Sequence, residues 1–161
     1  MTSEPPIVIK PAPIQRRVEV PLAPDAAFDL FVARMGDWWL KSHSLTKSGQ
    51  RAVTIERRPG GRWYETGMDG EECDWGHVIE IDTPHRILLA WQLDATWTFN
   101  PALITELEMT FTALASGGTE VKLEHRKLEA YGEKADETAA ILNSDTAWTG
   151  LLGCFVAKAS E

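Results

Sequence analysis

Apolar and polar residues alternate along most of the chain, and this alternation predicts β-strands. The first alternating segment is 14–20, in which Ile14, Val18 and Val20 share one face. Six more segments follow in series, at about 51–58, 62–68, 73–81, 86–97, 104–114 and 119–126. Glycine and proline turns separate them, beginning with Pro59-Gly60-Gly61. Because strands joined by tight turns pair antiparallel, we expect a curved antiparallel sheet of about seven strands.

Helical spacing occurs in two places. Pro24 and Asp25 precede an amphipathic segment, and a second short helical turn is expected at 37–40 because Gly36 weakens the first helix. Beyond residue 132 the pattern predicts a long C-terminal helix, one face of which is formed by Ile141, Trp148, Leu152 and Phe155. The segment Asn143-Ser144-Asp145 is either the cap at which this helix begins or an exposed turn within it.

These elements predict a single α+β domain in which the sheet wraps around the C-terminal helix. A chain of 161 residues has the usual size of one domain. Residues 1–13 contain four prolines around a short apolar run, so we expect an extended or disordered N-terminal tail there. The domain itself is expected to span residues 14–161.

Seven tryptophans are the unusual feature of the composition. Each brings a large flat surface and one N–H donor, so seven in a small domain indicate a wide aromatic core or an aromatic-walled pocket. Core packing is the simpler explanation for any single tryptophan. All seven do not easily fit as filling between one helix and one sheet, so we expect some to line a cavity.

Charge and cysteine content exclude several classes of partner and site. A net charge of −8 repels phosphate backbones and anionic lipids, so neither nucleic acid nor a membrane surface is an expected partner. Cys73 and Cys154 lie far apart, which favours free thiols in a reducing compartment. The chain has no long apolar run and no signal-peptide pattern at its start, so we expect a cytoplasmic protein.

Alternation places two histidines among apolar residues on the inner face of the sheet. We expect His77 beside Trp75, Ile79 and Ile81, and His125 beside Val121 and Leu123. In one interpretation His77, His125 and Glu65 form a polar end of the cavity that orients a ligand or moves a proton. In the other, each histidine bonds a backbone carbonyl or a buried water, or lies in solvent at a strand end.

The expected cavity is therefore mostly aromatic, with Trp97 and Phe99 elsewhere around it. Neither metal nor cofactor is expected, because the histidines and cysteines lack ligand spacing and the glycine-rich turns lack a phosphate-loop pattern. The predicted ligand-binding residues are Trp38, Trp39, Trp63, Glu65, Trp75, His77, Trp91, Phe111, His125, Trp148 and Leu152.

Several local motifs occur in the order found in a known family. They are Val18-Glu19-Val20-Pro21, Ala27-Phe28, Asp37-Trp38-Trp39, Arg58-Pro59-Gly60-Gly61-Arg62-Trp63, the run 76–86, Trp91, Thr110-Phe111, the run 117–121 and Trp148. The sequence resembles the homologues of the activator of the heat-shock-protein-90 ATPase, in the START-like (SRPBCC) superfamily that includes the birch-pollen-allergen fold. The resemblance implies a helix-grip fold over nearly the whole chain apart from the tail.

The resemblance implies a fold more strongly than a function, because such folds host unrelated activities. Superfamily members bind lipids, hormones or polyketide-like molecules in the cavity, and some are cyclases, dehydratases or hydrolases. We expect a binding domain for a small apolar or aromatic molecule, and an enzyme acting in the same cavity is the alternative. A protein-interaction role, as a homodimer or a chaperone cofactor, is the third hypothesis. Chaperone contact is not favoured, because the chaperone activator resembles a two-domain protein whose other domain makes that contact.

Overall fold

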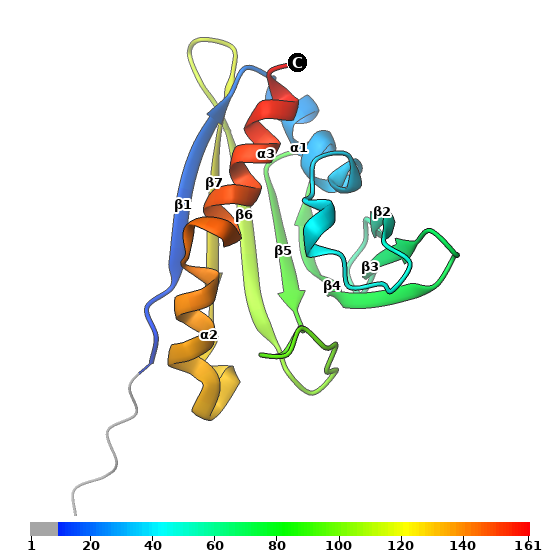
Figure 1. The fold of residues 1–161 in the computed structure, drawn as a ribbon. Coiled ribbons are helices and arrows are strands. Elements are labelled where there is room, and N and C mark those ends of the chain that lie inside the picture. The colour runs from blue at the N-terminus through cyan, green and yellow to red at the C-terminus, as the bar shows by residue number, and fades with distance from the viewer. Residues whose placement is uncertain (1–9) are drawn as a thin grey trace, which may run out of the picture.

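The computed structural model describes residues 10–161 and has a single curled sheet of seven antiparallel strands (Figure 1). Strand order across the sheet is β1-β7-β6-β5-β4-β3-β2. The strands are β1 (Ile14–Val20), β2 (Gln50–Ile55), β3 (Arg62–Gly67), β4 (Glu72–Asp82), β5 (Arg86–Trp91), β6 (Thr105–Ala113) and β7 (Thr119–Arg126). The predicted α+β helix-grip architecture is confirmed. Residues 1–9 of the expected tail lie outside the described residues.

Helices cover the concave face of this sheet. In Figure 1, α2 (Ala135–Leu142) and α3 (Gly150–Ala159) run along β1, β7 and β6, while α1 (Pro24–Val32) lies beside α3. Four short helical segments connect the larger elements, and they are η1 (Met35–Asp37), η2 (Lys41–His43), η3 (Leu128–Lys134) and η4 (Asp145–Thr149). Among residues 10–161, none of the helices combines the length and the apolar character needed to span a bilayer.

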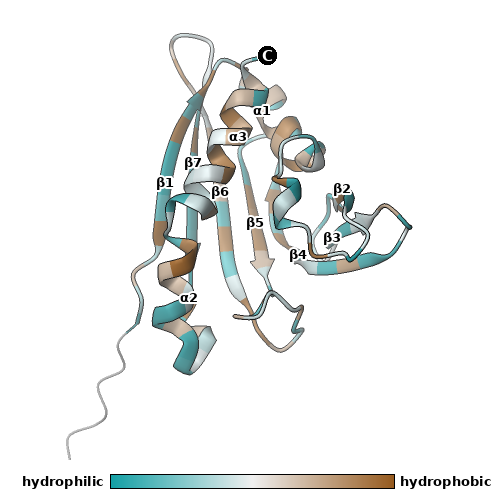
Figure 2. Ribbon diagram, viewed as in Figure 1, coloured by the Kyte–Doolittle hydropathy of each residue, from teal (hydrophilic) through white to brown (hydrophobic). Residues whose placement is uncertain are grey.

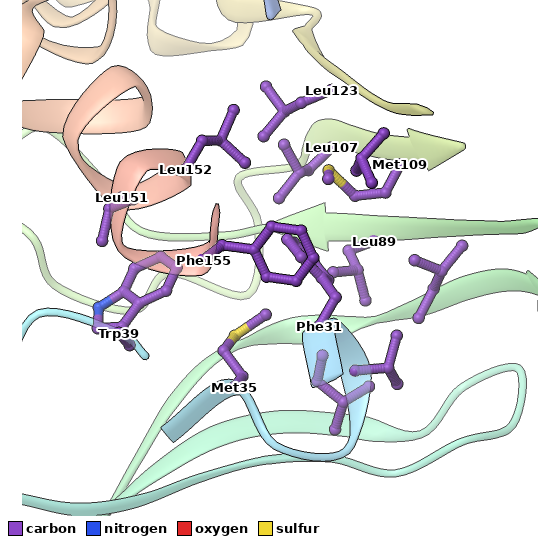
Figure 3. Packing of buried hydrophobic residues seen from close by; sticks show 14 of the residues in the cluster. Phe31, Met35, Trp39, Leu89, Leu107, Met109, Leu123, Leu151, Leu152 and Phe155 are labelled. Atoms are coloured by element: carbon purple, nitrogen blue, oxygen red, sulfur yellow. The ribbon is translucent and has the colours of Figure 1, made fainter. Parts of the chain in front are cut away.

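The apolar core fills the space between α1, α3 and the middle of the sheet. Figure 2 shows hydrophobic residues along β5 and on α3. The ring of Phe31 packs 5.6 Å from that of Phe155 and 6.0 Å from that of Phe111. In Figure 3, Leu89 of β5 and Leu107 of β6 lie beside the side chains of Phe31 and Phe155. This part of the domain is a close-packed interior.

The C-terminal helical segment is interrupted at residues 143–149, and the Asn143-Ser144-Asp145 segment is a turn within it. The Ser144 hydroxyl donates to the carbonyl of Ile141 at 2.6 Å, and Ala147 has non-helical dihedrals of φ −94° and ψ −119°. Short polar side chains such as these compete with helical backbone bonds. The interruption rotates the face of α2, so Leu142 is buried and Ile141 is 44% exposed, contrary to the single helical face expected from spacing.

Arg16 holds this interruption against the sheet. Its register partner on β7 is Leu123, so its side chain lies on the inner face. The guanidinium donates to the Asn143 carbonyl at 3.1 Å, to the Asn143 amide oxygen at 2.8 Å and to the Thr149 hydroxyl at 3.0 Å. Arg16 therefore links β1 to both sides of the helix break.

A glycine at position 76 is required where β4 approaches β5. A Cβ atom at Gly76 would collide with the backbone carbonyl of Ala90, whereas one at Gly153 of α3 meets nothing within 4 Å. We expect Gly76→Ala to lower the free energy of unfolding by more than about 2 kcal/mol, since backbone must move. Gly153→Ala is the control and should raise it by about 0.5–1 kcal/mol. Urea unfolding of both variants measures this, and an unchanged Gly76→Ala would contradict the close approach.

Candidate functional site

A cavity of about 320 Å³ opens between the β4–β5 region of the concave face, the loop after η2 and the interrupted helix. Its volume lies at the small end of the range for ligand sites. Five tryptophans dominate its wall, and they are Trp39, Trp75, Trp91, Trp97 and Trp148. Polar groups come from Ser42, His43, Ser44 and Thr146, and aliphatic ones from Leu45, Leu93, Ile141, Leu142, Ala147 and Leu151. The site is thus an aromatic box with a polar rim.

The tryptophan rings form a continuous layer. Trp39 packs 4.9 Å from Trp75 and 5.9 Å from Trp148, and Trp148 packs 5.4 Å from Trp91. Trp63 lies behind this layer, 5.4 Å from Trp75 and 5.7 Å from Trp91. Such tilted and edge-to-face contacts are favourable geometries for aromatic pairs. The rings therefore support one another as a rigid wall.

Three of the lining indoles have no conventional hydrogen-bond partner for their N–H groups. The Nε1 atoms of Trp39, Trp75 and Trp91 are buried and unpartnered within residues 10–161. Their ring neighbours offer aromatic faces, which are weak acceptors. An unpartnered buried donor is destabilising, so these indoles carry a local energetic cost within the layer.

Glu65 of β3 holds the loop that forms the polar rim. Its buried carboxylate accepts hydrogen bonds from the Ser44 hydroxyl at 2.8 Å, from the backbone N–H groups of Leu45 and Thr46 at 3.0 and 2.9 Å, and from the Thr46 hydroxyl at 2.5 Å. Burial alone raises the pKa of Glu65, but these hydrogen bonds outweigh burial and hold that pKa below its ordinary value. Glu65 does not line the cavity. It positions Ser44 and Leu45, which do.

His125 fixes Trp148 to the sheet from behind the cavity wall. The indole N–H of Trp148 donates to His125 Nδ1 at 3.1 Å, so Nε2 carries the imidazole proton and donates it to the Thr105 hydroxyl at 2.8 Å. Thr105 in turn donates to the Trp91 carbonyl at 2.9 Å. Burial lowers the pKa of His125 to about 3, so the ring is neutral at physiological pH. His125 is on the inner face as expected, but it is bonded to its neighbours and does not line the cavity.

His77 lies on the opposite face of the sheet, and its predicted inner position is wrong. The register of β4 shifts twice. One shift lies between the residues that pair with Trp63 and Tyr64 of β3, and the other lies between Val78 and Glu80, which pair with β5. These shifts break the alternation of inner and outer side chains. His77 therefore pairs with Ala90 on the outer face, and its Nδ1 lies 2.7 Å from the amide oxygen of Gln92. Bulges of this kind re-aim side chains. Val78 takes the inner position instead.

The remaining predicted residues divide between wall and core. Trp39, Trp75, Trp91 and Trp148 line the cavity, whereas Trp38, Phe111 and Leu152 pack in the filled core. Trp38 donates its N–H to the Leu30 carbonyl at 3.0 Å. The sequence did not predict the rim residues 42–45, because in a loop without periodicity no pattern indicates which side chains face a cavity. It did not predict Thr146, because the position of the helix break was not known.

His43 is the one acid–base group among the described residues that line the cavity. Over residues 10–161, no three His, Cys, Asp or Glu side chains come together in a way that could hold a metal ion. The lining thus combines aromatic faces with a few hydrogen-bonding groups.

Replacing Glu65 by glutamine should loosen the rim. The amide has one acceptor where four donors converge, so we expect Glu65→Gln to lower the free energy of unfolding by roughly 2–4 kcal/mol. Because the folded pKa is depressed, the stabilisation from Glu65 is complete above its ordinary value of 4.5 and is lost as pH falls through the folded pKa. Urea unfolding should show this acid-dependent loss in the natural protein, and the loss over the same pH range should be smaller in the variant.

The control is Glu80→Gln, whose carboxylate is mostly exposed in an ion pair with Arg86. It should change stability by less than about 1 kcal/mol. Equal effects of the two substitutions would contradict the positioning role of Glu65.

Acid should also destabilise the fold through His125. The unfolded chain binds a proton near the ordinary pKa of 6.5 and the folded chain does not, so stability falls as pH drops below 6.5. The contribution is up to about 1.4 kcal/mol per pH unit. Urea unfolding at pH 7.5 and 5.5 should show a weaker pH dependence for His125→Gln, while His85→Gln, at an exposed position, keeps the natural dependence. Identical pH dependence in all three proteins would refute the neutral buried imidazole.

Comparison with solved structures finds close agreement over almost the whole chain. The anthrahydroquino-gamma-pyrone synthase Txn09 is 32% identical, with a TM-score of 0.65, and the match covers 92% of this chain and 97% of that one. The self-sacrificing resistance protein CalC from Micromonospora echinospora is 28% identical, with a TM-score of 0.69 and coverage of 91% and 93%. Protein Ms6760 from Mycobacterium smegmatis shares the fold at 20% identity and a TM-score of 0.59, with coverage of 91% and 87%.

A search of curated proteins finds no match. The family model described as activator of Hsp90 ATPase homolog 1-like protein matches residues 32–152, which include the tryptophan layer, the rim loop and the first turn of α3. This match confirms the resemblance drawn from the local motifs. The chain belongs to the activator of Hsp90 ATPase homolog 1-like family.

Proposed function

We propose that this protein binds a flat, fused-ring aromatic molecule that carries hydroxyl or carbonyl groups along one edge. The observation that carries the proposal is the cavity itself, whose wall contains five indole rings. Flat indole surfaces favour ring systems that can stack or meet them edge to face. A flexible acyl chain would gain less from such a wall.

The rim explains how such a ligand would be oriented. Ser42, Ser44 and Thr146 provide hydroxyl groups and His43 an imidazole to the cavity lining. The Ser42 and Thr146 hydroxyls and the imidazole can donate to or accept from phenol and quinone oxygens, whereas the Ser44 hydroxyl, which donates to Glu65, can accept from a phenol. Because Glu65 holds the backbone at Leu45 and Thr46, this rim is organised before a ligand arrives.

One relative supports the same ligand class. The structure 32% identical to this chain is named for an anthrahydroquino-gamma-pyrone product, which is a fused aromatic ring system. The match covers nearly the whole of both chains, so the two proteins share the fold that surrounds this cavity.

An enzyme acting on the same class of molecule is the second candidate, because that relative is a synthase. The general acid or base would then be His43. The histidines first considered for this role, His77 and His125, lie on the outer face and behind the wall respectively.

The test is a titration with 1,8-dihydroxyanthraquinone, followed by calorimetry and by tryptophan fluorescence. We expect saturable binding at one site, and much weaker binding of testosterone and of dodecanoate. Ala147→Phe fills the cavity wall and should weaken binding at least tenfold, whereas Ala113→Phe, at an exposed position on β6, should not. No binding of the natural protein, or equal affinity of the two variants, would refute the proposal. Mass spectrometry of the incubated compound separates an enzyme from a binding protein.

A further inference from the structure

The loop between β5 and β6 contains a small hairpin that points at the cavity mouth. Leu93 pairs with Phe99, the N–H of Asp94 donates to the Thr98 carbonyl at 2.9 Å, and the N–H of Trp97 donates to the Asp94 carbonyl at 2.9 Å. A hairpin of this length places a left-handed residue after its turn, a position that favours glycine. The residue here is Trp97, with φ at +61°.

A bulky residue in the left-handed region is strained, and it persists only where its surroundings hold it. The Asp94 carboxylate provides that support. It accepts hydrogen bonds from the Thr96 N–H at 2.8 Å, the Thr96 hydroxyl at 2.7 Å and the Thr98 N–H at 3.0 Å. None of these bonds involves the indole of Trp97, so the turn does not depend on having a tryptophan at this position.

The indole also contributes little to the core. It is 40% exposed, and its closest aromatic contact is an edge-to-face one with Trp91 at 6.3 Å. Together with the exposed Ile141 it lines the cavity. Met68 and Ile104, the other large hydrophobic side chains that are exposed among residues 10–161, do not line it. Strain and exposure of an aromatic residue therefore coincide at the cavity.

We propose that Trp97 is a clamp that covers the side of the bound molecule nearest the cavity mouth. This inference rests on the proposed function, and it narrows the ligand class to planar molecules large enough to reach from the inner tryptophans to the mouth. Strained backbone residues cluster at ligand clamps, where the strain serves ligand binding and not the stability of the fold. Trp97 is thus a specificity-determining residue. Replacing it should weaken ligand binding without lowering the stability of the fold.

The experiment compares Trp97→Gly with the natural protein in thermal unfolding and in calorimetric titration with 1,8-dihydroxyanthraquinone. Glycine relieves the left-handed strain, so the variant should be at least as stable as the natural protein. Loss of the stacked ring should weaken binding by roughly tenfold or more. Trp97→Phe should fall between the two in affinity.

Lys127→Gly is the matched control, because Lys127 is the other non-glycine residue with positive φ among residues 10–161, and it does not line the cavity. It should keep the natural affinity. Unchanged affinity of Trp97→Gly would overturn the clamp while leaving the proposed function intact. A drop of several degrees in its melting temperature would show a structural role and overturn the clamp, as would equally weakened binding by Lys127→Gly. Failure of the natural protein to bind the probe would remove both proposals together.

Discussion

The hydrogen bond between Trp148 and His125 joins the interrupted helix to the sheet. It requires a neutral imidazole, because Nδ1 must accept from the indole while Nε2 donates to Thr105. Burial enforces this state, since desolvation disfavours the charged ring. Through Thr105 and the Trp91 carbonyl, the same chain of bonds reaches the end of β5. The ring of Trp148 is therefore fixed in position and orientation.

That fixed ring divides the interior into two parts. On one side, Phe31, Phe155 and Leu152 pack as an ordinary core. On the other, the helix break at 143–149 prevents a continuous helix from covering β4 and β5, and the cavity occupies that space. Polar side chains hold its borders from outside, with Arg16 at the break and Glu65 at the rim loop. A single fold thus contains a close-packed core and, beside it, an open cavity.

The strands and their antiparallel order followed from alternation, because each face of a half-buried strand is read directly from the sequence. The individual residues of the site could be predicted less well, because local irregularities of the backbone decide which side chains face the cavity. Two register shifts in β4 moved His77 to the outer face, and no residue pattern in that strand announces them. The polar residues at 143–145 were consistent with a cap or a turn, and only tertiary contacts with Arg16 decide between them. Trp97 occupies a turn position where glycine is expected, so its conformation could not be anticipated.

The proposed function requires the tryptophan layer to be a ligand-binding wall and the adjoining core to stay closed to the ligand. The indole N–H region of a ¹⁵N–¹H correlation spectrum reports on all seven tryptophans at once. On addition of 1,8-dihydroxyanthraquinone, the signals of Trp39, Trp75, Trp91, Trp97 and Trp148 should move most, since these rings line the cavity. The signal of Trp38, whose N–H is bonded to the Leu30 carbonyl in the core, should move least. Uniform small shifts, or a response confined to Trp38 and Trp63, which do not line the cavity, would contradict ligand binding at this wall.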